Sequence, residues 1–251
     1  MAKKFFSMAM LAMLATWFVA CDKSDDDNNN DENIIVVDLG LPSGIKWATC
    51  NVGATNPWDY GNYYAWGETK TKSDYSWETY KYYNGSNHSL TKYNYNAEYG
   101  TVDNKNTLES ADDVATAVFG ADYSMPTTAD WDELSSQCYW VWTTNYNEQN
   151  VSGYIVYHPK SDGDKGVKVY INGTALDSYS LSDVHIFLPA AGFRYYSGLD
   201  LAGYCGYYWS SSLYGHDPSG ARNCTFGSDY VSPSDIYNRY GGFSGRPVKR
   251  P

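Results

Sequence analysis

The sequence predicts an α+β fold in which two helices are inserted among many short, mostly antiparallel strands and long loops. Three observations lead to this prediction. Short runs of β-branched and aromatic residues are separated by Gly, Pro, Asn and Asp. Two segments in the middle of the chain carry helix start signals. The composition, with 26 tyrosines, 9 tryptophans and 22 glycines, disfavours a helical bundle.

The strands are expected on both sides of the helices. Each candidate is a short run rich in Val, Ile, Tyr, Phe or Trp, bounded by turn residues. The stretch 70–107 is polar, rich in Tyr and Asn and without any period, so it is expected to form long loops. The predicted strands cover 34–39, 45–50, 62–67, 139–143, 153–157, 167–171, 185–188, 207–211, 221–226 and 242–248.

The two helices are placed by their capping residues. Ser110 is expected to cap the first helix. Thr127 is expected to cap the second, with Asp130 at the capping-box position three residues further on. In the second helix Trp131 and Leu134 are expected to point inward.

The N-terminus predicts export. Lys3 and Lys4 precede an apolar, uncharged stretch over 5–20, which is too short to span a bilayer of roughly 30 Å and is typical of a signal peptide. The residues before Cys21 resemble the bacterial lipobox, so we expect residues 1–20 to be removed and Cys21 to be lipidated. The alternative is an ordinary signal peptide that leaves Cys21 as a spare thiol.

The acidic segment 21–33 is predicted to be a flexible tether between the lipid and the folded domain, because it has nothing apolar to bury. Ser24 to Asp27 resembles the acidic export signal with which Bacteroidota send lipoproteins to the outer face of the outer membrane. We therefore expect a lipid-anchored protein of the outer membrane that faces the cell exterior. A periplasm-facing protein is the alternative.

Residues 34–251 are expected to form one domain, since no linker-like composition interrupts them. The whole chain has a formal net charge of −11, and the domain alone is near −8. An acidic body of this kind argues against nucleic acid as a partner and against electrostatic docking on anionic lipid.

Four further cysteines are expected to form disulfides, because an exported protein with an even number of cysteines often does so. Four cysteines allow three pairings. We expect Cys50–Cys138 and Cys205–Cys224, the second of which would close a local loop. Free buried thiols are the alternative. Metal binding is not expected, because no two cysteines have zinc-ligand spacing and the histidines are scattered.

Seven segments, taken in order, resemble one known family. They are VDLGLPSG (37–44), WATCNVGA (47–54), YAWGE (64–68), MPTTADWDEL (125–134), IFLPAAGFR (186–194), YWSSS (208–212) and GFSGRPV (242–248). The family is the Fibrobacter succinogenes major paralogous domain, which is common in surface lipoproteins of Bacteroidota. The resemblance implies a C-type lectin-like fold, related also to formylglycine-generating enzymes, but it implies little about activity.

Catalysis is not expected. The formylglycine-generating enzymes use a nearby pair of cysteines, and the 19-residue separation of Cys205 and Cys224 does not match that motif. The sequence also lacks a nucleophile elbow, a zinc-protease motif and a phosphate-binding glycine loop. No cofactor is predicted. The run Asp162-Gly163-Asp164 is interpreted as a turn rather than as a calcium loop, because the later bidentate Glu position holds Gly173.

The function expected from the sequence is therefore a non-catalytic binding module for a glycan or a surface protein. Tyr and Trp rings stack on the apolar faces of sugars and also anchor protein ligands. The candidates lie in the loop-rich segments and are Trp58, Trp77, Tyr80, Tyr82, Tyr83 and Tyr93. For each ring, a place in the core is the alternative. A structural or assembly subunit of a surface fibre or envelope complex is the alternative function.

The location can be tested by protease treatment of intact cells. If the tether displays the domain outward, added protease is expected to remove it from whole cells while a periplasmic marker survives. Complete protection of the domain in intact cells, with digestion only after lysis, would contradict the outward orientation.

Overall fold

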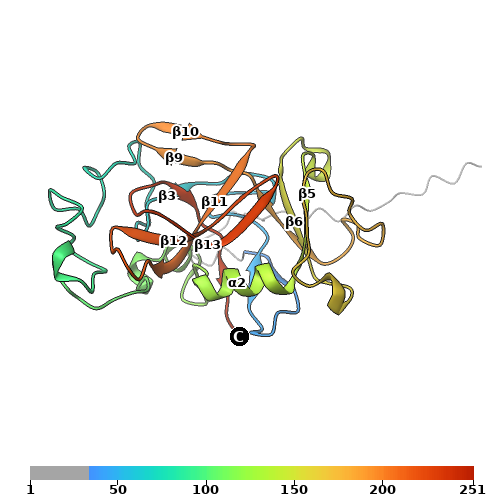
Figure 1. Ribbon diagram of the computed structural model, residues 1–251, viewed down its shortest axis with the longest axis horizontal. Helices are drawn as coiled ribbons and strands as arrows, with labels where there is room; N and C mark the ends of the chain where they lie inside the picture. The colour runs from blue at the N-terminus through green and yellow to red at the C-terminus, as the bar shows by residue number, and fades with distance from the viewer. Residues whose placement is uncertain (1–33) are drawn as a thin grey trace, which may run out of the picture.

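The computed structural model describes residues 34–251. The predicted signal peptide (1–20), the lipidation site Cys21 and the acidic tether (21–33) lie outside the described residues. Within 34–251 the chain is mostly β, with two short helices and four sheets in which antiparallel pairing dominates. Figure 1 shows β9 (Phe193–Tyr195) and β10 (Gly198–Asp200) along the upper edge and β5 (Tyr139–Thr143) and β6 (Gly153–Tyr157) on the right. Helix α2 (Thr128–Gln137) lies below β12 (Gly220–Gly227) and β13 (Tyr230–Asn238). The predicted mixture of short strands and two helices is confirmed.

The first sheet joins the two ends of the domain. Its strand order is β1-β2-β15-β4, and all its pairs are antiparallel. Trp47 of β2 lies opposite Val248 of β15, so residues about 200 positions apart share one ladder. The strands are β1 (Val36–Asp38), β2 (Lys46–Ala48), β15 (Val248–Lys249) and β4 (Tyr123–Ser124).

The largest sheet has the order β13-β12-β11-β14-β3. Its long strands pair antiparallel, and only β11 and β14 run parallel. Its members are β13 (Tyr230–Asn238), β12 (Gly220–Gly227), β11 (Cys205–Leu213), β14 (Phe243–Ser244) and β3 (Tyr63–Tyr64).

The two remaining sheets are a four-stranded sheet of order β7-β5-β6-β8 and the hairpin β9–β10. The first contains β7 (Lys168–Val169), β5 (Tyr139–Thr143), β6 (Gly153–Tyr157) and β8 (His185–Pro189). The hairpin contains β9 (Phe193–Tyr195) and β10 (Gly198–Asp200). Four single 3₁₀ turns lie in the loops, at Ala97–Tyr99, Ser110–Asp112, Tyr146–Glu148 and Asp162–Asp164.

The helices begin where side chains satisfy their free N–H groups. Helix α2 (Thr128–Gln137) has the predicted capping box between Thr127 and Asp130. Helix α1 (Val114–Phe119) is capped by Asp113 rather than by Ser110, because the Asp113 carboxylate accepts bonds from the N–H groups of residues 115 and 116. Ser110 instead opens a 3₁₀ turn.

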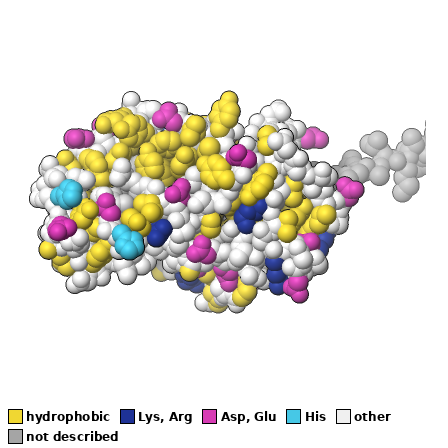
Figure 2. All heavy atoms as spheres, in the orientation of Figure 1, with side chains coloured by type: hydrophobic (Ala, Val, Ile, Leu, Met, Phe, Trp, Pro, Cys, Tyr) yellow, Lys and Arg dark blue, Asp and Glu magenta, His cyan; other side chains and the backbone are white. Residues whose placement is uncertain are grey.

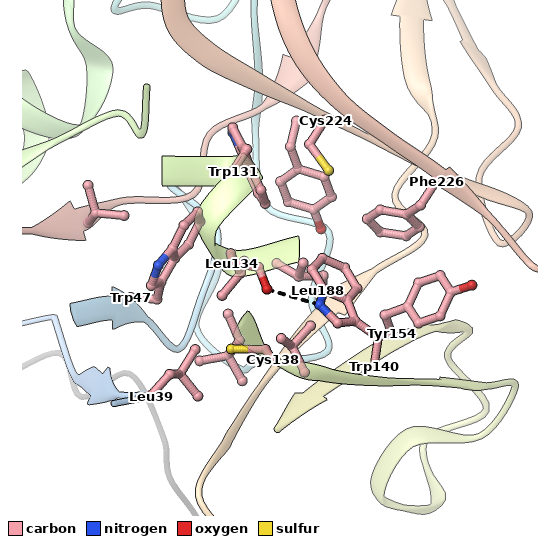
Figure 3. Close-up of a cluster of buried hydrophobic side chains, with 14 of the residues drawn as sticks. Leu39, Trp47, Trp131, Leu134, Cys138, Trp140, Tyr154, Leu188, Cys224 and Phe226 are labelled. Atoms are coloured by element: carbon pink, nitrogen blue, oxygen red, sulfur yellow. Dashed lines mark hydrogen bonds between the residues drawn. The ribbon is translucent and has the colours of Figure 1, made fainter. Parts of the chain in front are cut away.

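One hydrophobic core lies where α2 packs against the sheets, and Figure 3 shows its side chains converging. Trp47 and Trp131 lie with their ring centroids 4.7 Å apart. Trp140 donates its indole N–H to the carbonyl oxygen of Leu134, at 3.2 Å. The four tryptophans of the family-like segments, Trp47, Trp66, Trp131 and Trp209, are all buried.

The two expected disulfide pairings, Cys50–Cys138 and Cys205–Cys224, do not form. Cys138, Cys205 and Cys224 are free thiols. On the β11–β12 ladder Cys205 lies opposite Gly227 and Cys224 opposite Tyr208, so the two thiols are three positions apart and point to opposite faces. That separation is about 10 Å along the strand, beyond the reach of a disulfide. Cys138 lies in the core at the end of α2, where burial raises its pKa to about 12.

A second core is built around a buried cation, Arg239. Its guanidinium donates to the hydroxyl oxygen of Tyr80 at 2.8 Å and to the carbonyl oxygens of Lys92 (2.9 Å), Tyr93 (3.2 Å) and Pro218 (2.9 Å). The rings of Trp66, Tyr80, Tyr82 and Tyr93 surround it at 5.0 to 6.0 Å. These contacts attach the loops of 70–107 to the end of β13.

Replacing Arg239 by lysine is expected to lower the free energy of unfolding by about 3 kcal/mol, because an ammonium cannot reach all four acceptors and leaves buried oxygens unpaired. Chemical denaturation would measure this loss. Arg222→Lys is the matched control, because Arg222 is only half-buried, makes one hydrogen bond, to the Ser234 carbonyl oxygen, and lies over one ring, that of Tyr214. Equal losses in the two variants would contradict the role of Arg239.

Candidate binding surface

The structure separates the six aromatic residues that the sequence suggested for ligand binding. Tyr80, Tyr82 and Tyr93 are 3%, 5% and 0% exposed and form the cage around Arg239. A ring buried to this extent cannot stack on a ligand, so these three residues are core residues. Trp77 and Tyr83 are half-buried and lie next to each other, with ring centroids 5.8 Å apart. Trp58 is half-buried at a different place, against Tyr146.

The most exposed aromatic element is the β9–β10 hairpin. All seven residues of 195–201 are exposed. Tyr195 is 38% and Tyr196 is 53% exposed. Figure 2 shows hydrophobic side chains gathered over the position of this hairpin, with acidic side chains among them and the basic side chains of that face lying lower.

The hairpin rings continue into the loop that carries Trp77. Tyr195 contacts Tyr196 at 4.5 Å and Tyr240 at 6.0 Å between ring centroids, and Tyr240 contacts Trp77 at 5.0 Å. Trp77 in turn stacks on Tyr83. We call Tyr195, Tyr196, Trp77 and Tyr83, with Tyr240 beneath them, the aromatic surface. It joins two of the predicted residues to three that were not predicted.

Backbone bonds hold the hairpin in place. Tyr196 and Tyr75 exchange two backbone hydrogen bonds of 2.9 Å, and Arg194 and Gly242 exchange two of 2.8 and 2.9 Å. At the base Gly192 has φ +64°, and a Cβ there would lie 2.1 Å from the Asp200 carbonyl oxygen, so only glycine fits. The backbone that carries the exposed rings is therefore held in place.

Tyr196 has a strained backbone. Its φ of 49° lies in the left-handed region, which bulky residues rarely occupy and which Gly or Asn normally supplies at a hairpin tip. Such a conformation costs on the order of 1 kcal/mol or more. Backbone strain in an exposed aromatic residue points to a role other than stability.

Carboxylates border the aromatic surface. A hydrogen bond with Tyr195 is the main cause that raises the pKa of Tyr196, and Glu78 and Asp74 lie close enough to raise it further. In the hairpin register Gly198 lies opposite Tyr195 and Asp200 opposite Phe193, so the Asp200 and Tyr195 side chains share one face. Two nearby basic side chains, Lys72 and Arg194, already contact other residues of the chain. Lys72 pairs with Glu68 at 2.9 Å, and Arg194 lies 5.3 Å from the centre of the Tyr63 ring.

Away from the aromatic surface, a polar groove of about 410 Å³ lies between the 40–42 turn and the 158–165 loop. Its two lysines are engaged, since Lys165 pairs with Asp162 and Lys160 with Asp183, each at 2.7 Å. The Asp164 carboxylate accepts a bond from the Tyr179 hydroxyl at 2.6 Å. Among residues 34–251 no group of three His, Cys, Asp or Glu side chains is placed to hold a metal ion.

The sequence contains one local signal for the exposed hairpin. Tyr195-Tyr196-Ser197-Gly198 places two aromatic residues immediately before a Ser-Gly pair, which is a turn signal. The preceding residues, 186–194, belong to a family-like segment, whereas 195–198 carry no motif of that family. Aromatic residues next to a turn signal are therefore the pattern that would have selected Tyr195 and Tyr196.

Comparisons with protein-family models, with curated proteins and with solved structures gave no match for this chain. Within the part of the chain that the structure describes, no helix has the length and apolar character needed to cross a membrane. The candidate surface therefore rests on the geometry of the chain itself.

Replacing Tyr196 by asparagine is expected to leave stability unchanged or to raise it by up to about 1 kcal/mol, because Asn adopts the left-handed conformation at lower cost. Thermal unfolding would measure the change. Tyr195→Asn is the control. This variant loses similar ring contacts but relieves no backbone strain, so it should be less stable than the wild type. A Tyr196→Asn variant destabilised as much as the control would show that the Tyr196 ring is structural.

Proposed function

We propose that this protein is a non-catalytic binding module and that its ligand, a glycan or a surface protein, contacts the aromatic surface. The observation that carries this proposal is a continuous row of aromatic rings on a fixed hairpin whose tip residue is strained. Exposed Tyr and Trp rings supply large contact areas at low conformational cost, which is why they are frequent in binding surfaces.

The fold and family belong to the same proposal. We propose a C-type lectin-like fold and membership of the Fibrobacter succinogenes major paralogous domain. In support, the tryptophans of the resembling segments are core residues, and the last of these segments, 242–248, reaches the largest sheet through β14 and the first sheet through β15. Residues that set a fold are expected at such positions.

The proposed location follows from the N-terminal sequence. We propose that lipid on Cys21 anchors the protein in the outer membrane and that the tether displays the domain to the exterior. A domain charge near −8 supports a partner other than nucleic acid.

A second function, as a structural or assembly subunit, is favoured by one observation. Strand β13 is nine residues long and stands at the edge of the largest sheet, with β12 as its only strand neighbour in the described chain. An open edge of this kind can pair with a strand of another subunit. Co-purification with other envelope subunits would support this function, whereas a protein that stays monomeric and copurifies with none would oppose it.

The binding function can be tested with glycan and peptide arrays, using the full-length protein in mild detergent. The wild type is expected to bind a defined set of ligands, and Tyr195→Ser/Tyr196→Asn should weaken that binding about tenfold or more, because two contact rings are lost. Tyr170→Ser/Tyr230→Asn is the matched control, since those two rings are each 39% exposed but lie outside the aromatic surface.

Two results would overturn the proposal. One is a wild-type protein that binds nothing on either array. The other is binding that the hairpin variant retains in full while both variants keep the wild-type circular dichroism spectrum.

A further inference from the structure

We propose that the aromatic surface recognises a basic protein segment, in which lysine or arginine side chains lie over the exposed rings and pair with the surrounding carboxylates. This inference rests on the proposed binding function and names the chemistry of its ligand. Three observations carry it: the carboxylates that have no cation, the rings that have no cation, and the way the chain binds its own lysines.

The carboxylates of the aromatic surface are without a counter-ion. Asp74, Glu78 and Asp200 form no ion pair with any residue of 34–251. One oxygen of Asp74 is buried and accepts no hydrogen bond from the described residues. Some carboxylates elsewhere in the described chain, such as Asp112, Asp130 and Asp183, are paired with a lysine or arginine, whereas others, such as Glu148 and Asp177, are not. The surface therefore offers negative charge that the protein does not neutralise.

The rings of the aromatic surface are also free of cations. Within the described chain, no lysine or arginine lies over the Tyr195, Tyr196 or Trp77 ring. A ring face attracts a cation, and Trp and Tyr are the strongest partners of this kind.

The chain shows how the same groups bind a cation when one is present. Lys81 pairs with Asp112 at 2.6 Å and lies 5.0 Å from the centre of the Tyr82 ring. Lys92 contacts the same Asp112 and lies 4.7 Å from the centre of the Tyr93 ring. In both cases a tyrosine ring and the Asp112 carboxylate contact the ammonium group, and Lys92 also pairs with Glu109 at 2.6 Å. The aromatic surface presents this combination to solvent.

A basic segment fits these features better than a glycan does. A neutral sugar would use the rings but would gain nothing from the negative potential, and an acidic sugar would be repelled by it. A cation gains from both groups, and each gain adds to the specificity for lysine or arginine. The hairpin residues 195–201 are exposed, so a segment of another protein can reach their side chains.

The test measures binding of three peptides of equal length to the full-length protein by biolayer interferometry. One peptide alternates lysine with glycine, one alternates serine with glycine and one alternates glutamate with glycine. The lysine peptide is expected to bind about tenfold or more tightly than the serine peptide, and the glutamate peptide should not bind. Raising NaCl from about 50 to about 300 mM should weaken binding of the lysine peptide, because salt screens the attraction between its ammonium groups and the carboxylates.

Charge-matched variants separate a specific site from general attraction to an acidic protein. Glu78→Gln/Asp200→Asn should weaken binding of the lysine peptide about tenfold. Tyr195→Ser/Tyr196→Asn should also weaken this binding, although it leaves the net charge of the protein unchanged. Glu148→Gln/Asp177→Asn removes the same charge at exposed positions outside the surface and should leave binding within about twofold of the wild type.

Equal weakening by the two charge variants, or equal binding of the lysine and serine peptides, would overturn this inference. So would a neutral glycan whose binding depends on Tyr195 and Tyr196 but is unaffected by Glu78→Gln/Asp200→Asn. That last result would leave the proposed binding function standing. Unaltered binding of every ligand by the hairpin variant would instead remove the proposed function itself.

Discussion

The interaction on which much of this structure depends is the enclosure of Arg239 by aromatic rings and carbonyl oxygens. No carboxylate of the described chain pairs with it, so its charge is balanced by four hydrogen bonds and four ring faces. A second layer supports this cage. The Tyr93 hydroxyl donates to Asp112 at 2.7 Å. Burial acts to raise the pKa of Asp112, but hydrogen bonds from Lys81, Lys92 and Tyr93 outweigh it and lower that pKa.

This arrangement explains how a polar, aperiodic stretch of loops becomes part of a core. Residues 70–107 contain too few aliphatic side chains to bury on their own, but their tyrosines offer apolar faces and hydroxyl groups together. Tyr80 and Tyr93 use both, since each ring packs inward while its hydroxyl makes a hydrogen bond. Trp77 and Tyr83, two rings of this stretch that do not surround Arg239, reach the aromatic surface.

The sequence predicted the regular elements better than the site. Strands β5 and β6 and the Thr127 capping box were predicted at their observed positions. Short runs of aromatic and β-branched residues bounded by turn residues, and capping residues, are local signals. Strand β13 was missed because Ser, Pro and Asp interrupt its pattern, which an edge strand tolerates. The predicted strand 242–248 is split because Arg246 turns inward to the Ala48 and Phe187 carbonyl oxygens. Which tyrosines of the loops are exposed depends on Arg239, a residue far from them in the sequence.

The pairing of β2 with β15 has a consequence for the order of events in the cell. Trp47 meets Val248 in one ladder, so the first sheet cannot be completed until the last residues of the chain are available. Contacts of such long range also slow folding, because the intervening chain must be closed into a loop first. For the exported protein that we propose, this delay would leave the chain unfolded while it crosses the membrane.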